Sequence, residues 1–182
     1  MLRTYDPTTE YTAFAAAILI AAVAALFDFR QGRIPNWLTL PPLIIAPIAY
    51  GLVHGLAGAA MSIGGIVLCG LVPWLLFRQG AIGGGDVKMT AAIGAVTGVL
   101  LGLKIEFVSL LVAGIYALGR LAWEGQLLRT LGNSFFLAAN PLLPKHWRRS
   151  ITPTMLATVR MGGAFVAAAI LSFISEHPEL LR

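Results

Sequence analysis

Six apolar stretches, each about as long as the hydrocarbon core of a bilayer is thick, limit what this chain can fold into. They cover residues 11–29, 38–55, 57–77, 87–103, 105–123 and 155–175. A helix needs roughly 17–25 mostly apolar residues to cross that core, where its backbone groups must be satisfied internally. The sequence therefore predicts an all-α, polytopic membrane protein with six transmembrane helices.

The composition agrees with a protein that lies mostly in lipid. Of the 182 residues, 58% are hydrophobic and 12% are charged, whereas soluble domains carry about 25% charged residues. We expect a single membrane-embedded domain over residues 1–182, in contact with the lipid bilayer. The net charge of +5 is ascribed to anchors at the membrane surface, and we expect no nucleic acid as a partner.

The distribution of basic residues predicts how the chain is oriented. If the first connection faces the cytoplasm, 10 of the 13 lysines and arginines lie on that side. The positive-inside rule then places both termini outside a cell inner (plasma) membrane. The one long connection, residues 124–154, has apolar residues at helical spacing. We expect a short amphipathic helix there, on the cytoplasmic membrane surface.

The sequence contains no pattern that is typical of a metal or cofactor site. Its single cysteine, Cys69, lies inside an apolar stretch, so neither a disulfide within the chain nor a paired-cysteine zinc site can form. No two of the three histidines have the spacing of metal ligands. We therefore expect no metal and no cofactor.

Two aspartates lie at the ends of apolar stretches, where a carboxylate is expensive to keep. Asp28 ends the first stretch and Asp86 precedes the fourth, so the predicted topology places both at the cytoplasmic boundary. Two carboxylates held close together share a proton, because they cannot both ionise easily. One can then activate water while the other polarises a scissile carbonyl. The pair predicts an aspartyl protease, and residues 83–85, all glycine, would permit unusual backbone shapes and close approach of a substrate strand.

The segments around both aspartates resemble those of the type IV prepilin peptidase family. Residues 83–88 (GGGDVK) are similar to its GxGD motif, and residues 28–39 (DFRQGRIPNWLT) are similar to its other block. The resemblance implies a membrane aspartic endopeptidase without a metal, with Asp28 and Asp86 as the catalytic pair. It would remove the leader from prepilin-like precursors (pilins, pseudopilins or flagellin-like proteins) at the cytoplasmic face.

The same resemblance nominates supporting or substrate-binding residues, which are Gly83, Gly85, Lys88, Arg33 and Asn36. Three roles stay open for Lys88: tuning the aspartate pair, contacting an acidic side chain of the substrate, or anchoring the helix at the interface. Asn36 is a candidate either for orienting the pair or for binding the substrate backbone, and the Ile-Pro-Asn segment is alternatively a simple turn.

Larger members of this family carry a cytoplasmic zinc-binding region with paired cysteines and also methylate the new N-terminus. This chain has one cysteine and a short first connection, so the resemblance implies peptidase activity without N-methyltransferase activity. The small size is similar to that of the members serving Flp/Tad-type pili and of archaeal preflagellin peptidases. Pilus or secretion assembly machinery is therefore a candidate partner.

Two other interpretations remain open at this stage. Asp28 and Asp86 would also suit a small proton- or ion-coupled transporter, although transporter carboxylates usually lie near mid-membrane. A non-catalytic subunit of a secretion system would tolerate replacement of both aspartates. In that case Asp28 would simply pair with Arg30 or Arg33, and Asp86 would cap a helix.

Overall fold

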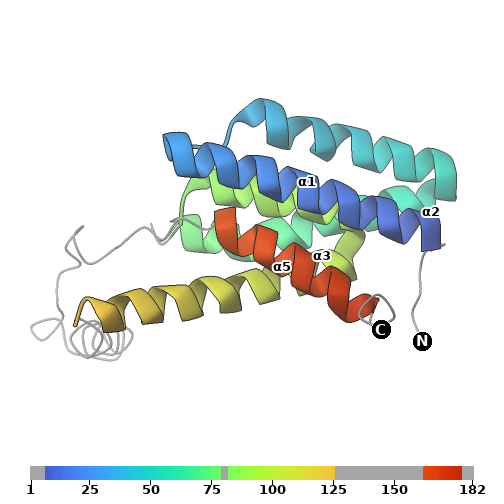
Figure 1. Cartoon of the computed structure of the whole chain (residues 1–182). Coiled ribbons are helices and arrows are strands. Elements are labelled where there is room, and N and C mark those ends of the chain that lie inside the picture. The colour runs from blue at the N-terminus through green and yellow to red at the C-terminus, as the bar shows by residue number, and fades with distance from the viewer. Residues whose placement is uncertain (1–6, 79–81, 126–161, 178–182) are drawn as a thin grey trace, which may run out of the picture.

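The computed structural model describes residues 7–78, 82–125 and 162–177, and within them every regular element is a helix. The helices are α1 (Pro7–Gln31), α2 (Asn36–Arg78), α3 (Gly84–Trp123) and α5 (Gly162–Glu176) (Figure 1). Three regions, Glu10–Gln31, Asn36–Arg78 and Gly84–Arg120, are long and apolar enough to cross a membrane. The all-α class is thus confirmed, and the helices indicate a membrane protein.

Helix α2 consists of two helical segments that fold back on each other at Gly55. This residue has φ 68° and ψ −161°, a conformation that glycine adopts at little cost. Residues eight apart on a straight helix lie about 12 Å apart. Here a Cβ on Gly58 would lie only 3.1 Å from the carbonyl carbon of Tyr50. The boundary expected between residues 55 and 57 is therefore where the chain reverses (Figure 1).

Helix α3 folds back in the same way, but earlier than expected. Its non-helical residue is Gly98, with φ 73° and ψ −175°, and a Cβ on Gly102 would lie 3.0 Å from the Cα of Gly94. The expected boundary at Lys104 is wrong. Lys104 does not need a turn exposed to water, because its ammonium donates to Ser175 Oγ at 2.8 Å and pairs with Glu176 on α5.

The two hairpins made by α2 and α3 approach each other closely through glycine. A Cβ on Gly65 would lie 2.7 Å from the carbonyl carbon of Gly94, and a Cβ on Gly94 would lie 2.9 Å from the Cβ of Cys69. Ser62 Oγ donates to the carbonyl of Ala95 at 2.7 Å across the same contact. Small residues and interhelical hydrogen bonds are what hold helices together in lipid.

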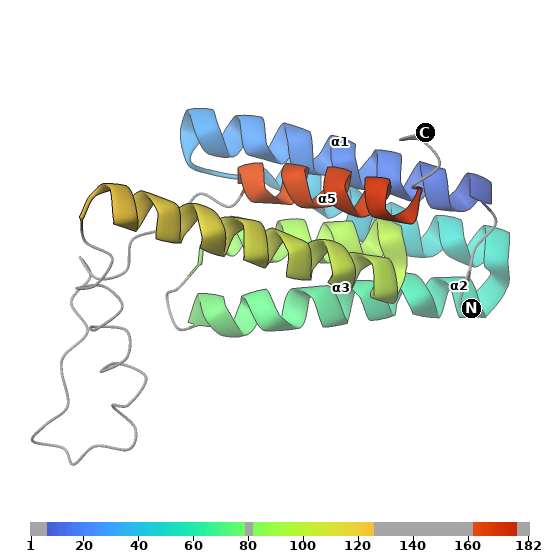
Figure 2. The ribbon, with the colours of Figure 1, turned by 60° about the horizontal axis from the view of Figure 1, so that its bottom comes forward.

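Helices α1 and α5 cover one side of the α3 hairpin and share an apolar core with it (Figure 2). The buried members of this core are Phe14, Ala17, Ile20, Ala21, Ala24, Met89, Ile93, Ile105, Phe165, Ala168 and Ala169. Its alanines let α1 and α5 lie close to α3. This packing fixes α1, which carries Asp28, relative to α3, which carries Asp86.

An apolar pocket of about 480 Å³ lies between α1, the first half of α2 and the first half of α3. Its walls include Ala13 and Ala16 on one side and Ala46 and Ala49 on the other. Neither Asp28 nor Asp86 belongs to its lining. The pocket is therefore separate from both aspartates.

Several expectations are not decided by the described residues. Six membrane crossings, termini outside and a single domain over residues 1–182 remain predictions. The amphipathic helix expected within 124–154 lies outside the described residues except for Glu124 and Gly125, which follow the end of α3. The first part of the last apolar stretch, 155–161, lies outside them as well.

Candidate active site

Asp28 lies in the last turn of α1, and the way that helix ends fixes its backbone. Gly32, with φ 62°, follows the helix, and its N–H donates to the carbonyl of Asp28 at 2.9 Å. A glycine in the left-handed conformation is a common stop for a helix, because it bonds a carbonyl of the last turn. The half-buried Asp28 side chain is thus held at a sharply defined helix end.

Asp86 lies in the first turn of α3, three residues after the N-cap residue Gly83. Its Oδ2 accepts a hydrogen bond from the N–H of Gly83 at 3.2 Å, and its own N–H donates to the carbonyl of Gly83 at 3.1 Å. A carboxylate in the first turn satisfies an N–H group that the helix leaves unpaired, and it is favoured by the helix dipole. The half-buried side chain is therefore oriented by its own helix end.

The two aspartates come together from separate helices. Asp28 is close enough to Asp86 for their charges to repel each other, although 58 positions separate them in the sequence. Like charges that lie close together disfavour simultaneous ionisation. The structure thus places the two carboxyls within range of each other's charge, and their role as a catalytic pair stays a prediction.

The glycines before Asp86 act differently from what the sequence suggested. Among the described glycines only 32, 55, 98 and 125 have positive φ, so residues 83–85 adopt no conformation reserved for glycine. Gly84 and Gly85 are needed instead because neighbouring side chains leave little room for a Cβ. A Cβ on Gly85 would lie 3.2 Å from the Cβ of Ile34, and a Cβ on Gly84 would lie 3.4 Å from the Phe77 ring. The protein's own side chains thus approach Gly84 and Gly85 closely, and close approach of a substrate strand stays a prediction.

Two of the expected supporting residues bind each other. The Lys88 ammonium donates to Oδ1 of Asn36 at 2.8 Å. This bond joins the start of α2 to the first turns of α3, and so connects the two sequence motifs. Arg33 is exposed on the connection between α1 and α2, and the structure gives it no hydrogen bond or ion pair with another described residue.

Comparison with known proteins adds one finding to this geometry. The model of the type IV leader peptidase family matches residues 15–118, which is more than half of the chain and contains both aspartates. The chain belongs to this family. The resemblance seen in the two motifs is thereby confirmed. Searches among curated proteins and among solved structures found no match.

Sequence reasoning missed two residues that shape the candidate site. Gly32 follows α1, and its N–H donates to the carbonyl of Asp28. A glycine directly after an apolar helix is a known sign of a helix end, so the sequence could have revealed it. Ile34 packs against Gly85 across the site. No local pattern predicts that contact, because it depends on how α1, α2 and α3 are arranged in space.

Proposed function

We propose that this leader peptidase is an aspartic endopeptidase in which Asp28 and Asp86 form the catalytic pair. The observation that carries the proposal is the position of two half-buried carboxyls, at the ends of separate helices and within range of each other's charge. The Asp86 carboxyl is oriented by the N–H of Gly83, and the backbone of Asp28 is fixed by the end of α1. The segment matched by the family model includes both.

The pair would hydrolyse a peptide bond without a covalent intermediate on the enzyme. The ionised carboxylate takes a proton from water, and the water oxygen attacks the scissile carbonyl carbon. The protonated carboxyl donates its proton to the carbonyl oxygen as the tetrahedral intermediate forms. When the C–N bond breaks, the pair gives a proton to the leaving amine and takes one back from a hydroxyl of the intermediate, whose oxygen becomes the carbonyl of the new carboxyl group. One carboxyl proton therefore remains on the pair for the next cycle.

We propose that the substrates are prepilin-like precursors and that the leader is removed at the cytoplasmic face of the inner membrane. The exposed Arg30 and Arg33 support a cytoplasmic position for this end of the bundle. We also propose that residues 1–182 do not methylate the new N-terminus, because their single cysteine cannot form a paired-cysteine zinc region. Flp/Tad-type pili and archaeal preflagellin processing remain the two expected settings.

The structure favours a peptidase over a transporter. Asp28 lies in the last turn of its helix and Asp86 in the first turn of its own. Transporter carboxylates usually lie near the bilayer midplane, at interrupted helices. Within the described helices the interruptions are at Gly55 and Gly98, and neither is next to an aspartate.

Co-expression with prepilin-like precursors tests the proposal. The wild type, Asp28→Asn and Asp86→Asn are each expressed with the precursor, and its processing is followed by gel shift and N-terminal sequencing. We expect cleavage at one bond by the wild type and by neither variant. Cleavage by either variant would mean that the aspartates are structural.

A further inference from the structure

We propose that the hydrogen bond between Lys88 and Asn36, here called the Lys88–Asn36 clasp, is a positioning device for the aspartate pair. It holds the start of α2 against the first turns of α3, and with it the connection between α1 and α2 (residues 32–35). The inference rests on the proposed function, because its effect is on the rate at which the pair cleaves a precursor. Both residues act on the pair through position and not by contact with the reacting atoms.

The side chains of Lys88 and Asp86 point in different directions from α3. Lys88 follows Asp86 by two positions, and side chains two apart on a helix do not face each other. Lys88 instead reaches Oδ1 of Asn36 at 2.8 Å. One residue before Asp86, Gly85 packs against Ile34 of the same connection. The first turns of α3 are thus contacted twice by residues 34–36, on either side of Asp86 in the sequence.

The connection between α1 and α2 links the position of Asn36 to that of Asp28. At its beginning, the N–H of Gly32 donates to the carbonyl of Asp28. At its end, the rings of Phe27 on α1 and Trp37 on α2 pack edge to face, with centroids 5.6 Å apart. Any shift of Asn36 away from α3 therefore moves the end of α1 as well. The clasp sets the separation of Asp28 and Asp86 through this short path.

Such a contact affects catalysis more than folding. Both partners are exposed, and exposed lysine contacts contribute little to the stability of a protein. Catalytic groups are far more sensitive, since a misplacement of about 1 Å can slow a reaction by roughly 100-fold. Loss of the clasp should therefore lower kcat while leaving the fold and substrate binding nearly unchanged.

Variants that break the clasp from either side test this. Asn36→Ala, Lys88→Met and the double variant are purified as the full chain, and kcat and KM for a precursor are measured in lipid vesicles from pH 5 to pH 9. We expect each single variant to lower kcat roughly tenfold at every pH, with KM within about twofold. The double variant should be no slower than either single variant, since both remove one interaction.

Exchanging Lys88 and Asn36 tests whether restoring the hydrogen bond restores kcat. The combined change Asn36→Lys with Lys88→Asn moves the donor to α2 and the acceptor to α3, and it should restore kcat to within about threefold of the wild type. Asn36→Ala separates geometry from charge, because it removes the bond and leaves the lysine. If only Lys88→Met is slow, or if kcat falls at one end of the pH range only, Lys88 acts through its charge and the clasp is refuted.

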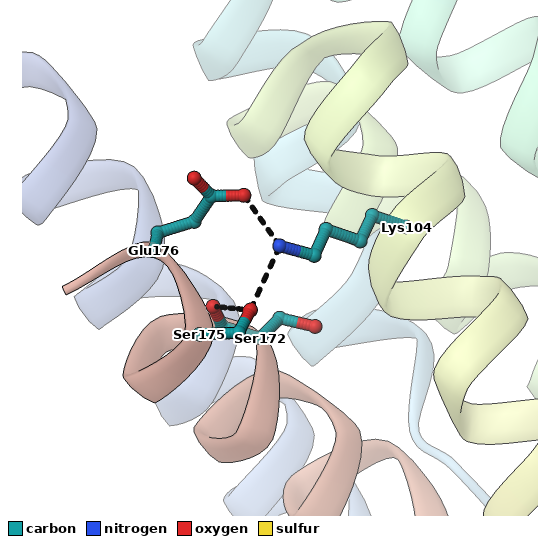
Figure 3. Close-up of polar contacts among 4 residues, drawn as sticks. All are labelled: Lys104, Ser172, Ser175 and Glu176. Carbon is teal, nitrogen blue, oxygen red and sulfur yellow. Dashed lines mark hydrogen bonds and ion pairs between the residues drawn. The ribbon is translucent and has the colours of Figure 1, made fainter. Parts of the chain in front are cut away.

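Lys104→Met is the matched control. Lys104 also lies on α3 and binds a neighbouring helix, where its ammonium sits between Ser175 and Glu176 of α5 (Figure 3). The residue after Glu176, His177, stacks on Tyr11, which precedes Asp28 on α1 by 17 residues or about 25 Å. This variant should unfold at a lower temperature and keep the wild-type kcat per folded molecule.

The outcomes separate the clasp from the proposed function. If Asp28→Asn and Asp86→Asn are inactive while Asn36→Ala and Lys88→Met keep the wild-type kcat, the clasp is wrong and the aspartic peptidase stands. An equal loss of kcat in Lys104→Met would show a general effect of loosened helices and would also refute the clasp. If the wild type cleaves no precursor, both proposals fail together.

Discussion

At the scale of single residues, Glu106 differs from the other carboxylates of the described chain. Its side chain is 5% exposed, and neither carboxyl oxygen has a hydrogen-bond partner among the described residues. A buried polar group without a partner costs about 1–3 kcal/mol. Glu106 has no part in the arrangement of Asp28 and Asp86. Its burial therefore lowers the stability of the fold, and helix packing must offset this loss.

Replacing Glu106 with leucine should therefore stabilise the protein. Glu106→Leu keeps a side chain of similar volume and removes the unpartnered carboxyl, so we expect a gain of about 1–3 kcal/mol and unchanged cleavage. The thermal unfolding midpoint in detergent measures this. Glu106→Ala is the control, because the cavity that it leaves should cancel the gain. A lower midpoint for Glu106→Leu, or loss of cleavage, would show that the carboxyl has a partner or a function.

The sequence allowed the two aspartates to be chosen, but not all of their surroundings. Asp28 and Asp86 could be proposed as site residues because a carboxylate at the end of an apolar stretch is energetically costly, which suggests a function. Gly85 could be singled out from the motif, yet the physical need for it lies in its contact with Ile34. Such a contact joins residues far apart in the sequence, so no local pattern reveals it.

At the scale of helices, the glycine contact between α2 and α3 should be the least tolerant of added volume. A Cβ on Gly65 would lie 2.7 Å from the carbonyl carbon of Gly94, and backbone cannot move aside cheaply. We expect Gly65→Ala to cost about 1–3 kcal/mol of stability, measured as a lower thermal midpoint. Gly114→Ala is the control, because nothing lies within 4 Å of its Cβ position. It should be neutral or slightly stabilising. Equal midpoints for the two variants would contradict the close helix contact.

The helix ends show where reading the sequence works and where it fails. Gly55 coincides with the boundary expected from the apolar stretches, because the chain has to turn between two stretches of full length. The turn at Gly98 was expected instead at Lys104, on the assumption that a lysine marks a boundary with water. Ser175 and Glu176 on α5 supply that lysine with partners inside the fold. Charge alone cannot reveal such partners before the helices are assembled.

At the scale of the whole molecule, the orientation in the membrane can be tested by labelling single cysteines. Cys69 is buried and is first replaced with serine, after which Arg33→Cys and Leu56→Cys are made separately. Both positions are exposed: Arg33 lies just before α2, and Leu56 lies at the far end of its first half, next to Gly55. A membrane-impermeant maleimide should label residue 56 in intact cells, and residue 33 only after the cells are opened. The reverse pattern would contradict both the orientation and cleavage at the cytoplasmic face.

The central claim is that Asp28 and Asp86 together cleave a precursor, and single-turnover cleavage by purified enzyme in lipid vesicles tests it most directly. Wild type, Asp28→Asn, Asp86→Asn and the double variant are compared at equal amounts of folded protein. We predict that each single variant loses at least about 1,000-fold in rate and that the double variant is no slower, because the two carboxyls act as a unit. A rate above roughly a tenth of the wild type in either single variant would contradict the account.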